Sequence, residues 1–370
     1  MPGRARKPNG LLMSIHLLVL NYNGRSLLEE CLPSVVRAAE LSRHDCRVAV
    51  IDNASHDDSV PWLRCRHPQV DVIHRPNRGL CSFNAVLAEL DSHVAILLNN
   101  DIRMADDAVD PLVAPLLEID PSEPGCFMAA PLCWQSDGET YEGFRTAVCW
   151  RWGLVQATAH FPRHEGTDFQ PDLTASAGAA LAVDRRIFLE LGGFDPLYLP
   201  GRIEDLDFAF RGYLAGYVAR YVPESVVYHR GMSTFGKIYG VGGCDRLALR
   251  NTLLFQWKNL RHPQHVVRQL TGFPLRIARD VARAPWEPAA TRLPFVHALV
   301  AAWAQWRKMR GQIVWPQRSR REERSPPLLR HTAAERAFFR RFHPRRMAAA
   351  TAGGRPTIDA TKSSLVEVGI

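Results

Sequence analysis

The first hundred residues alternate between continuous apolar runs and helical periodicity, and this alternation predicts a layered α/β fold. Residues 13–20 form an apolar run that ends in a polar turn, as expected of a strand buried on both faces of a sheet. Helices are then expected at 27–36 and 81–90, and strands at 47–51, 70–74 and 93–98. This order predicts a doubly wound mixed sheet flanked by helices.

Three of the expected strands end in polar clusters. The clusters are Asn21-Tyr22-Asn23, Asp52-Asn53 and Asn99-Asn100-Asp101. One such ending is ordinary turn chemistry, because Asn and Asp are common turn residues. Three of them at the carboxyl edge of one sheet favour a ligand site, since open α/β sheets bind their ligands there.

A strongly patterned helix is expected near the middle of the chain. Glu204, Asp205 and Asp207 fall close together, and apolar residues then recur at helical spacing: Leu206, Phe210, Tyr213 and Leu214. Acidic side chains are favourable at a helix N-terminus, where the helix dipole attracts negative charge. The same carboxylates also suit a proton acceptor at the mouth of a cleft, and the pattern leaves both interpretations open.

The segments on either side of this helix have weaker patterns. After a helix at 108–119 and an apolar stretch at 126–134, residues 138–174 fit a binding loop region or a surface hairpin equally well. Further strands are expected at 175–183, 217–221 and 225–228, and further helices at 184–191 and 245–259. His229 directly follows the last of these strands.

Composition indicates a globular protein, with 46% apolar and 23% charged residues. The 8 cysteines are scattered without a C-x-x-C pair, which argues against a zinc site or a disulfide framework and favours reduced thiols in a cytosol. No apolar run reaches the roughly 18 residues that a membrane span needs, and no secretory signal is evident. Residues 1–12 are expected to form a loose tail.

The net charge of +8 is concentrated in the C-terminal third. Two amphipathic helices are expected there, one carrying Val266, Leu270, Phe273, Ile277 and Val281 with a kink or break at Pro274, the other carrying Phe295, Leu299, Trp303 and Trp306. With arginines on their other sides, they fit an anionic membrane surface, or else pack on the rest of the chain. No nucleic-acid motif accompanies the arginines. Residues 318–327 are expected to be a linker.

Several polar residues have a chemistry of their own. Asp101 is a hard oxygen ligand that suits Mg²⁺ or Mn²⁺ bridging two phosphates, and His229 could complete such a site or be structural. Asp52 could accept a hydrogen bond from a uracil or thymine imide, or cap the turn at Ser55. A carboxylate from Glu204 or Asp205 could take the proton of an attacking sugar hydroxyl.

Two series of short motifs run through the chain. The first is Asn21-Tyr22-Asn23-Gly24, Ile51-Asp52-Asn53-Ala54-Ser55, Asn77-Arg78-Gly79 with Asn84, and Leu97-Leu98-Asn99-Asn100-Asp101. The second is Gly178-Ala179-Ala180, Gly192-Gly193-Phe194-Asp195, Glu204-Asp205-Leu206-Asp207, Gly216-Tyr217, Val222-Pro223 and His229. In this order they resemble the donor-side and acceptor-side motifs of family 2 glycosyltransferases with the GT-A fold, in the rhamnosyltransferase-like branch. The resemblance covers about residues 14–260.

The resemblance implies inverting transfer of a sugar from a nucleoside diphosphate sugar to a glycan or lipid-linked acceptor, as in polysaccharide and cell wall biosynthesis. It implies that Asp205 is the base, with Glu204 beside it, and that Asp101 and His229 hold Mg²⁺ or Mn²⁺. It further implies that the nucleotide sugar contacts Asn21, Tyr22, Asn23, Asp52, Asn53, Asn77, Asn84, Asn100 and Asp101.

The chain departs from the family pattern at one position. Asn99 stands where the usual Asp-x-Asp motif has its first aspartate, which leaves a single motif carboxylate. Arg211 also matches the family, and would form a structural salt bridge or contact a phosphate.

The predicted organisation is a tail at 1–12, a catalytic domain at 13–260, a basic helical extension at 261–346 and a disordered tail at 347–370. The expected location is the cytoplasm, with the extension on the inner face of the cell membrane. Two rival functions remain. A sugar nucleotidyltransferase would need a basic Gly-rich loop near the N-terminus, which is absent, and an inactive nucleotide-sugar-binding scaffold would not need Glu204, Asp205 and Asp101.

Overall fold

The structure is a computed structural model that describes residues 13–118, 124–161, 164–165, 168–231, 233–288, 292–316 and 327–349. The predicted N-terminal tail, residues 318–326 of the predicted linker and residues 350–370 of the predicted C-terminal tail lie outside these ranges.

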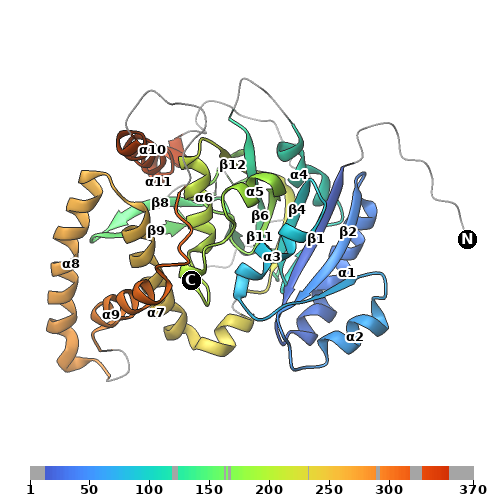
Figure 1. Cartoon of the computed structure of the whole chain (residues 1–370), viewed down its shortest axis with the longest axis horizontal. Coiled ribbons are helices and arrows are strands. Elements are labelled where there is room, and N and C mark those ends of the chain that lie inside the picture. The colour runs from blue at the N-terminus through green and yellow to red at the C-terminus, as the bar shows by residue number, and fades with distance from the viewer. Residues whose placement is uncertain are drawn as a thin grey trace, which may run out of the picture.

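The N-terminal part is a parallel sheet flanked by helices, as predicted (Figure 1). The central strand β1 (Ser14–Asn21) pairs in parallel with β2 (Asp45–Asp52) and with β4 (Val94–Asn99), and β2 pairs with β3 (Asp71–His74). The connecting helices are α1 (Arg25–Leu41), α2 (Ser59–Arg66), the short η1 (Gly79–Cys81) and α3 (Ser82–Glu89). The polar clusters that end β1, β2 and β4 therefore meet at one edge of the sheet.

Antiparallel strands extend the same sheet on the other side of β4. Strand β11 (Ala180–Asp184) lies antiparallel to β4 and to β6 (Cys126–Gln135), and β6 runs parallel to β12 (Val218–His229). The full order is β10-β12-β6-β11-β4-β1-β2-β3, with β5 (Ile102–Met104) paired to β12, β7 (Tyr141–Gly143) paired to β6, and β10 being Asp172–Leu173. The result is one mixed sheet of 10 strands.

Two strand predictions need correction. The strands expected at 217–221 and 225–228 form the single strand β12, whose pairing with β6 shifts between Val222 and Val226. Pro223 falls in this gap, where a proline cannot donate a ladder hydrogen bond. The strand expected at 175–183 begins only at Ala180, after Gly178 with φ +67°.

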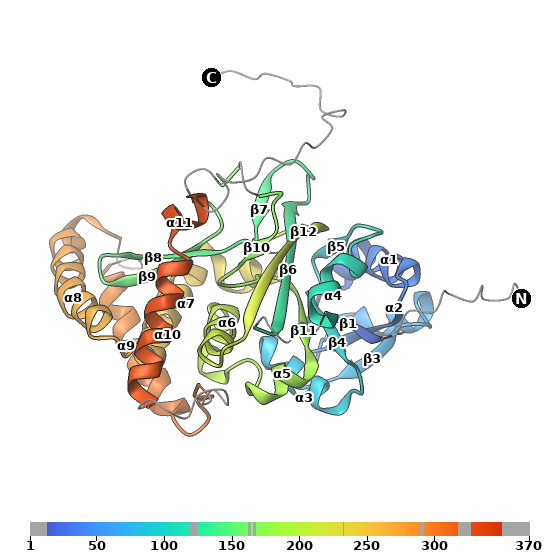
Figure 2. The ribbon, with the colours of Figure 1, turned by 90° about the horizontal axis from the view of Figure 1, so that it is seen from above.

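Residues 138–174, which the sequence left unassigned, contain β7, β10 and a separate hairpin of β8 (Ala147–Arg151) and β9 (Leu154–Thr158). The hairpin carries buried Val148 and Val155 into a second hydrophobic core. This core lies between α6 (Glu204–Leu214), α7 (Ser233–Asn259), α9 (Pro294–Met309) and α10 (Pro327–Arg341). Figure 2 shows these helices gathered on one side of the sheet. The remaining helices are α4 (Val109–Leu117), α5 (Arg185–Glu190), η2 (Pro196–Tyr198), α8 (Pro263–Arg283), η3 (Ala284–Trp286) and α11 (Pro344–Ala349).

The helices after residue 260 share the second core with the catalytic part. Phe295 of α9 and Phe338 of α10 are buried in it together with Phe210 of α6. Helix α8 is not broken at Pro274, where a kink or break was expected. Met347 is wholly buried within α11, so the predicted start of the disordered tail falls inside a helix.

None of the helices in the described ranges is long and apolar enough to cross a bilayer. All eight cysteines are free thiols. Burial raises the pKa of Cys31 and of Cys81 to about 12, so both thiols stay protonated at neutral pH.

We expect Phe338→Ala to lower the free energy of unfolding by about 3–5 kcal/mol, the usual cost of deleting a buried aromatic ring. The ring of Phe338 lies 4.9 Å from that of Phe210, between centroids, and is 3% exposed. Leu329→Ala is the matched control, because Leu329 is on the same helix but 62% exposed. Urea denaturation measures both, and equal losses would contradict a shared core.

Candidate active site

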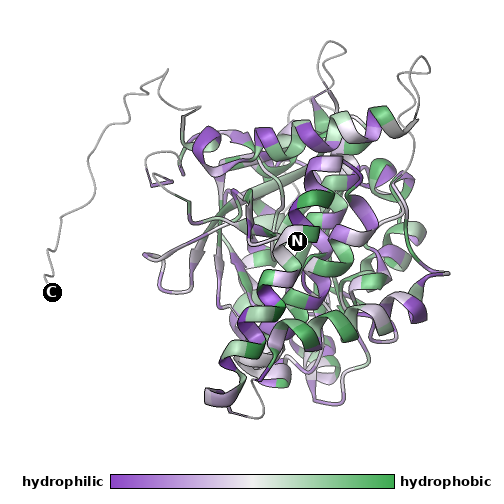
Figure 3. Ribbon diagram, turned by 90° about the vertical axis from the view of Figure 1, so that its left-hand side faces the viewer, coloured by the Kyte–Doolittle hydropathy of each residue, from purple (hydrophilic) through white to green (hydrophobic). Residues whose placement is uncertain are grey.

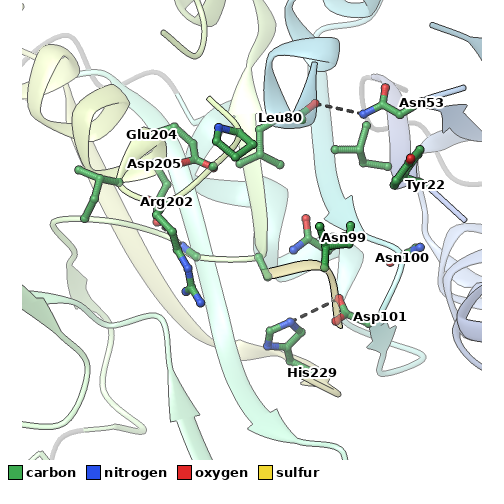
Figure 4. Close-up of a pocket in the computed structure, with 18 of the residues that line it drawn as sticks. Tyr22, Asn53, Leu80, Asn99, Asn100, Asp101, Arg202, Glu204, Asp205 and His229 are labelled. Carbon is green, nitrogen blue, oxygen red and sulfur yellow. Dashed lines mark hydrogen bonds and ion pairs between the residues drawn. The ribbon is translucent and has the colours of Figure 1, made fainter. Parts of the chain in front are cut away.

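A cavity of about 520 Å³ opens at the carboxyl ends of the parallel strands. Residues from both halves of the sheet line it, and Figure 4 shows many of them around one space. Of the residues predicted from sequence, the lining includes Tyr22, Asn53, Asn77, Asn100, Asp101, Glu204, Asp205 and His229. Asn99, at the departure from the family pattern, also lines it.

Asn21 and Asp52 lie behind this lining and support it. Asn21 is wholly buried, and its Oδ1 accepts a hydrogen bond of 2.8 Å from Nδ2 of Asn100, which lines the cavity. A side chain at Gly24 would collide with that Asn100 amide at 2.0 Å, so the contact depends on a glycine there. Asp52 is 2% exposed, and its Oδ2 accepts from the backbone N–H of Ser55 at 3.2 Å. This is the turn-capping role that the sequence left open.

Asn23 and Asn84, for which the resemblance implies contacts with the nucleotide sugar, are not among the residues that line this cavity. Asn23 has φ +48°, and its Oδ1 accepts from the backbone N–H of His56 at 2.7 Å. Asn84 clamps the backbone of Phe194, donating to its carbonyl at 2.8 Å and accepting from its N–H at 2.9 Å. Both asparagines therefore use their amides to hold loops together.

His229 lies between two carboxylates. Its Nδ1 is 2.5 Å from Oε1 of Glu142, and its Nε2 is 3.4 Å from Oδ1 of Asp101. Burial alone would lower the pKa of His229, but hydrogen bonds with Asp101 and Glu142 outweigh burial and raise this pKa to about 9. Because an ionised carboxylate can only accept and this pKa lies above neutrality, both ring nitrogens of His229 carry a proton at pH 7, and Nε2 can bind a cation only after losing its proton.

The donor set here fits a divalent cation that is also held by a ligand. Among the described residues, no group of three or more His, Cys, Asp and Glu side chains is arranged to hold a metal ion. However, Asp101 Oδ1 is buried, and apart from its ion pair with His229 it has no hydrogen-bond partner in the described chain. An unsatisfied buried carboxylate oxygen next to an imidazole nitrogen is a suitable pair of ligands for Mg²⁺ or Mn²⁺.

The loop before α6 holds two residues in the left-handed region, Arg202 with φ +80° and Ile203 with φ +75°. This conformation is costly for residues with a side chain, so other contacts must impose it. Asn251 of α7 supplies them, since its buried Nδ2 lies 2.7–2.8 Å from the carbonyl oxygens of Tyr198, Gly201 and Arg202. The loop thereby presents Glu204 and Asp205 at the first turn of the helix, as predicted.

Adjacent Glu204 and Asp205 have opposite environments. Oδ2 of Asp205 accepts hydrogen bonds from Oγ of Ser176 at 2.5 Å and from N–H of Gly178 at 3.1 Å. Oε2 of Glu204 is buried without a hydrogen-bond partner in the described chain. Burial and the charge of Asp205 raise the pKa of Glu204 to about 8.

The next carboxylate along the helix, Asp207, is wholly buried in an ionic cluster. Its oxygens lie 2.8 Å from Nζ of Lys258, 2.8 Å from Nε of Arg211 and 2.7 Å from Nδ2 of Asn259. Burial opposes ionisation, but the charges of Lys258 and Arg211 outweigh it and lower the pKa of Asp207 to about 2. Lys258 also binds Asp195 at 2.7 Å. Arg211 is thus part of a buried salt bridge, one of its two expected roles.

Four residues of the site were not predicted from sequence: Glu142, Ser176, Asn251 and Lys258. Asn251 and Lys258 are seven residues apart, on the face of α7 that also carries buried Leu254 and Phe255. Polar residues at core positions of a helix are a signal of a buried network that could have been read. Glu142 and Ser176 belong to irregular segments and have no comparable signal.

The comparisons with known proteins agree with this architecture. Residues 17–146 match the family model described as Glycosyl transferase family 2. The chain is 27% identical over 168 residues to a putative polypeptide N-acetylgalactosaminyltransferase 10 of Drosophila melanogaster, a match that covers 44% of this chain and 25% of that protein. The chain therefore spans about a quarter of the length of this curated relative.

Two solved structures show the same fold. One is GalNAc-T7 with UDP, GalNAc and Mn²⁺, with a TM-score of 0.50 and 18% identity, over 79% of this chain and 55% of that chain. The other is S. aureus TarS 1-349 in complex with UDP-GlcNAc, with a TM-score of 0.50 and 12% identity, over 89% of this chain and 90% of that chain. The mixed sheet therefore has the GT-A fold of these two structures. Residues 17–146, which match the glycosyl transferase family 2 model, form the N-terminal part of this fold.

The raised pKa of Glu204 makes stability depend on pH. Folding favours the protonated form of Glu204. The stability that this group contributes is therefore fully present below its pKa of 4.5 in the unfolded chain, and it is lost as the pH rises through about 8. We expect the melting temperature of Glu204→Gln, minus that of the wild type, to increase between about pH 5 and about pH 8. Differential scanning calorimetry tests this, and a difference that stays constant with pH would contradict it.

Proposed function

We propose that the chain is an inverting glycosyltransferase that moves a sugar from a nucleoside diphosphate sugar to an acceptor hydroxyl. The observation that carries the proposal is that Asp101 and Asp205, from opposite halves of the sheet, line one cavity. The family 2 match and the GT-A fold support the transferase class.

The donor is proposed to bind on the side formed by Tyr22, Asn53, Asn77 and Asn100. The cavity volume of about 520 Å³ falls within the range of ordinary ligand pockets. The related structures contain UDP or UDP-GlcNAc, which supports a nucleoside diphosphate sugar as the donor of this chain.

Asp101 and His229 are proposed to hold Mg²⁺ or Mn²⁺ together with the donor diphosphate, which supplies the remaining oxygen ligands. A divalent cation there would offset the negative charge that develops on the leaving diphosphate. The Mn²⁺ in the GalNAc-T7 structure supports this assignment. Glu142 orients the imidazole by holding its Nδ1–H, as carboxylates commonly do for histidines that bind metals.

Asp205 is proposed as the base. It accepts the proton of the acceptor hydroxyl while that oxygen bonds to the anomeric carbon and the bond from this carbon to the diphosphate oxygen breaks. One displacement with one base inverts the anomeric centre. Hydrogen bonds from Ser176 and Gly178 hold the carboxylate of Asp205 in place, whereas Glu204, with a pKa of about 8, is suited to donate a hydrogen bond to the sugar.

The acceptor is proposed to approach through a second hollow of about 420 Å³, which shares Ile238 and Tyr239 with the first cavity. Apolar residues and three groups suited to anions line it: Arg246, Arg250 and His297. This lining suits a glycan that is linked to a lipid through phosphate, with the chain on the inner face of a cell membrane.

The rival functions are less well supported. Oε2 of Glu204 is buried without a hydrogen-bond partner in the described chain, which typically costs about 1–3 kcal/mol. A binding scaffold without catalysis would gain nothing from this loss of stability. A sugar nucleotidyltransferase has no use for a base positioned like Asp205.

We expect Asp205→Asn to lower turnover about 10²- to 10⁴-fold, the usual contribution of a general base. Turnover is measured as nucleoside diphosphate release from the best donor in a panel of nucleoside diphosphate sugars. Donor affinity, measured by thermal stabilisation, should stay nearly the same because the phosphates contact other residues. Unchanged turnover would remove the base assignment.

We expect Glu142→Gln to weaken Mn²⁺ binding in the presence of UDP about 10- to 100-fold, because the imidazole of His229 loses its orienting carboxylate. Isothermal titration calorimetry measures this without a turnover assay. Glu139→Gln is the control, since Glu139 is an exposed residue of the adjacent turn. Equal Mn²⁺ affinity in the two variants would exclude the proposed role of Glu142.

A further inference from the structure

Helix α8 is held in place through one of its sides. His265, Gly272 and Asp280 are buried on that side. Gly272 packs directly on the β8–β9 turn, where an added side chain would come within 2.4 Å of the backbone of Gly153. Oδ2 of Asp280 accepts a hydrogen bond of 2.7 Å from the N–H of Phe295 in α9. These contacts fix which side of α8 faces outward.

The outward side of α8 is apolar along its whole length. Its exposed residues are Val266 at 37%, Val267 at 56%, Leu270 at 69%, Ile277 at 37% and Val281 at 59%. At about 100° per residue they fall within an arc of roughly 120°. Figure 3 looks onto this side of the molecule. Trp286, in the turn that follows the helix, is 82% exposed.

This apolar arc differs from the one that the sequence predicts. Phe273, expected on the membrane-facing side, packs against the second core, and so do Phe295 and Trp306 of the next helix. Val267, which the periodicity did not include, is exposed in the arc. The structure therefore divides the predicted apolar residues into those that fill a core and those that face outward.

The charges beside the arc are all positive. Arg268, Arg279 and Arg283 are exposed on one flank of α8, about 100° or more around the helix axis from Val267. Asp280 is the one acidic residue in the sequence of α8, and it is 9% exposed and engaged with α9. The outer surface of α8 therefore combines apolar side chains with cations and presents no carboxylate of its own.

We propose that this outer face of α8, with Trp286, docks the protein on an anionic lipid surface. A single helix with a continuous apolar arc, a terminal tryptophan and arginines on its flank has the arrangement of helices that lie in a membrane interface. The arginines then reach the anionic headgroups while the apolar arc enters the acyl boundary. The docking stands apart from the proposed transferase activity, since none of its residues lines the cavity.

The test is co-sedimentation of the full chain with vesicles of phosphatidylglycerol and phosphatidylcholine, compared with phosphatidylcholine alone. The wild type should bind the anionic vesicles, and high salt should weaken binding. A Leu270→Ser and Val281→Ser double variant should reduce the bound fraction about tenfold or more. An Arg279→Gln and Arg283→Gln double variant should reduce it several-fold on anionic vesicles.

Thr271→Ser with Ala282→Ser is the matched control, because both residues are exposed on α8 but outside the arc. This variant should bind like the wild type, and all variants should keep the same thermal stabilisation by UDP. Failure of the wild type to bind anionic vesicles, or equal binding by the Leu270/Val281 variant, overturns the proposal. Light scattering provides a further test. The proposal is also overturned if the wild type is a dimer, the Leu270/Val281 variant is a monomer, and the two bind vesicles equally.

Discussion

The position of the proposed base depends on how the charge of Asp207 is neutralised. An ionised carboxylate without solvent contact is very costly unless partners surround it, and removing one partner of a buried pair typically costs about 3–5 kcal/mol. Asp207 receives these partners from its own helix through Arg211 and from α7 through Lys258 and Asn259. The cluster forms only when α6 and α7 are in register, and this fixes the turn that carries Glu204 and Asp205.

The three carboxylates of that turn show how local donors assign different tasks to the same functional group. Asp207 is ionised and structural because two cations enclose it. Asp205 has two hydrogen-bond donors and faces the cavity, which suits proton acceptance. Glu204 is buried without such donors, and its pKa of about 8 keeps it protonated near neutrality. The sequence places all three at a helix start, but only their surroundings distinguish them.

Local sequence patterns predicted well the strands and helices that depend on local interactions. The buried strands β1, β2 and β4 appear as apolar runs, and their polar ends meet because parallel strands share an edge. The start of α6 was also predicted, from the acidic residues of its first turn. Contacts between residues distant in sequence were not predicted. Glu142 contacts His229 from an irregular segment, and the side chain of Asn84 donates a hydrogen bond to the backbone of Phe194. The amphipathic pattern of α8 showed two kinds of face, but only packing decides which residues are outside.

Strand β4 joins the two halves of the cavity, because it pairs in parallel with β1 and antiparallel with β11. Asp101 follows β4, while the backbone of Gly178, which holds Asp205, precedes β11. A strand advances about 3.3 Å per residue, so deleting one residue from either strand would displace the cation site from the base by a similar amount. In the proposed function, the number of residues in these two strands therefore sets the distance between the donor phosphate and the acceptor hydroxyl. A change in the length of either strand would therefore alter the distance between Asp101 and Asp205.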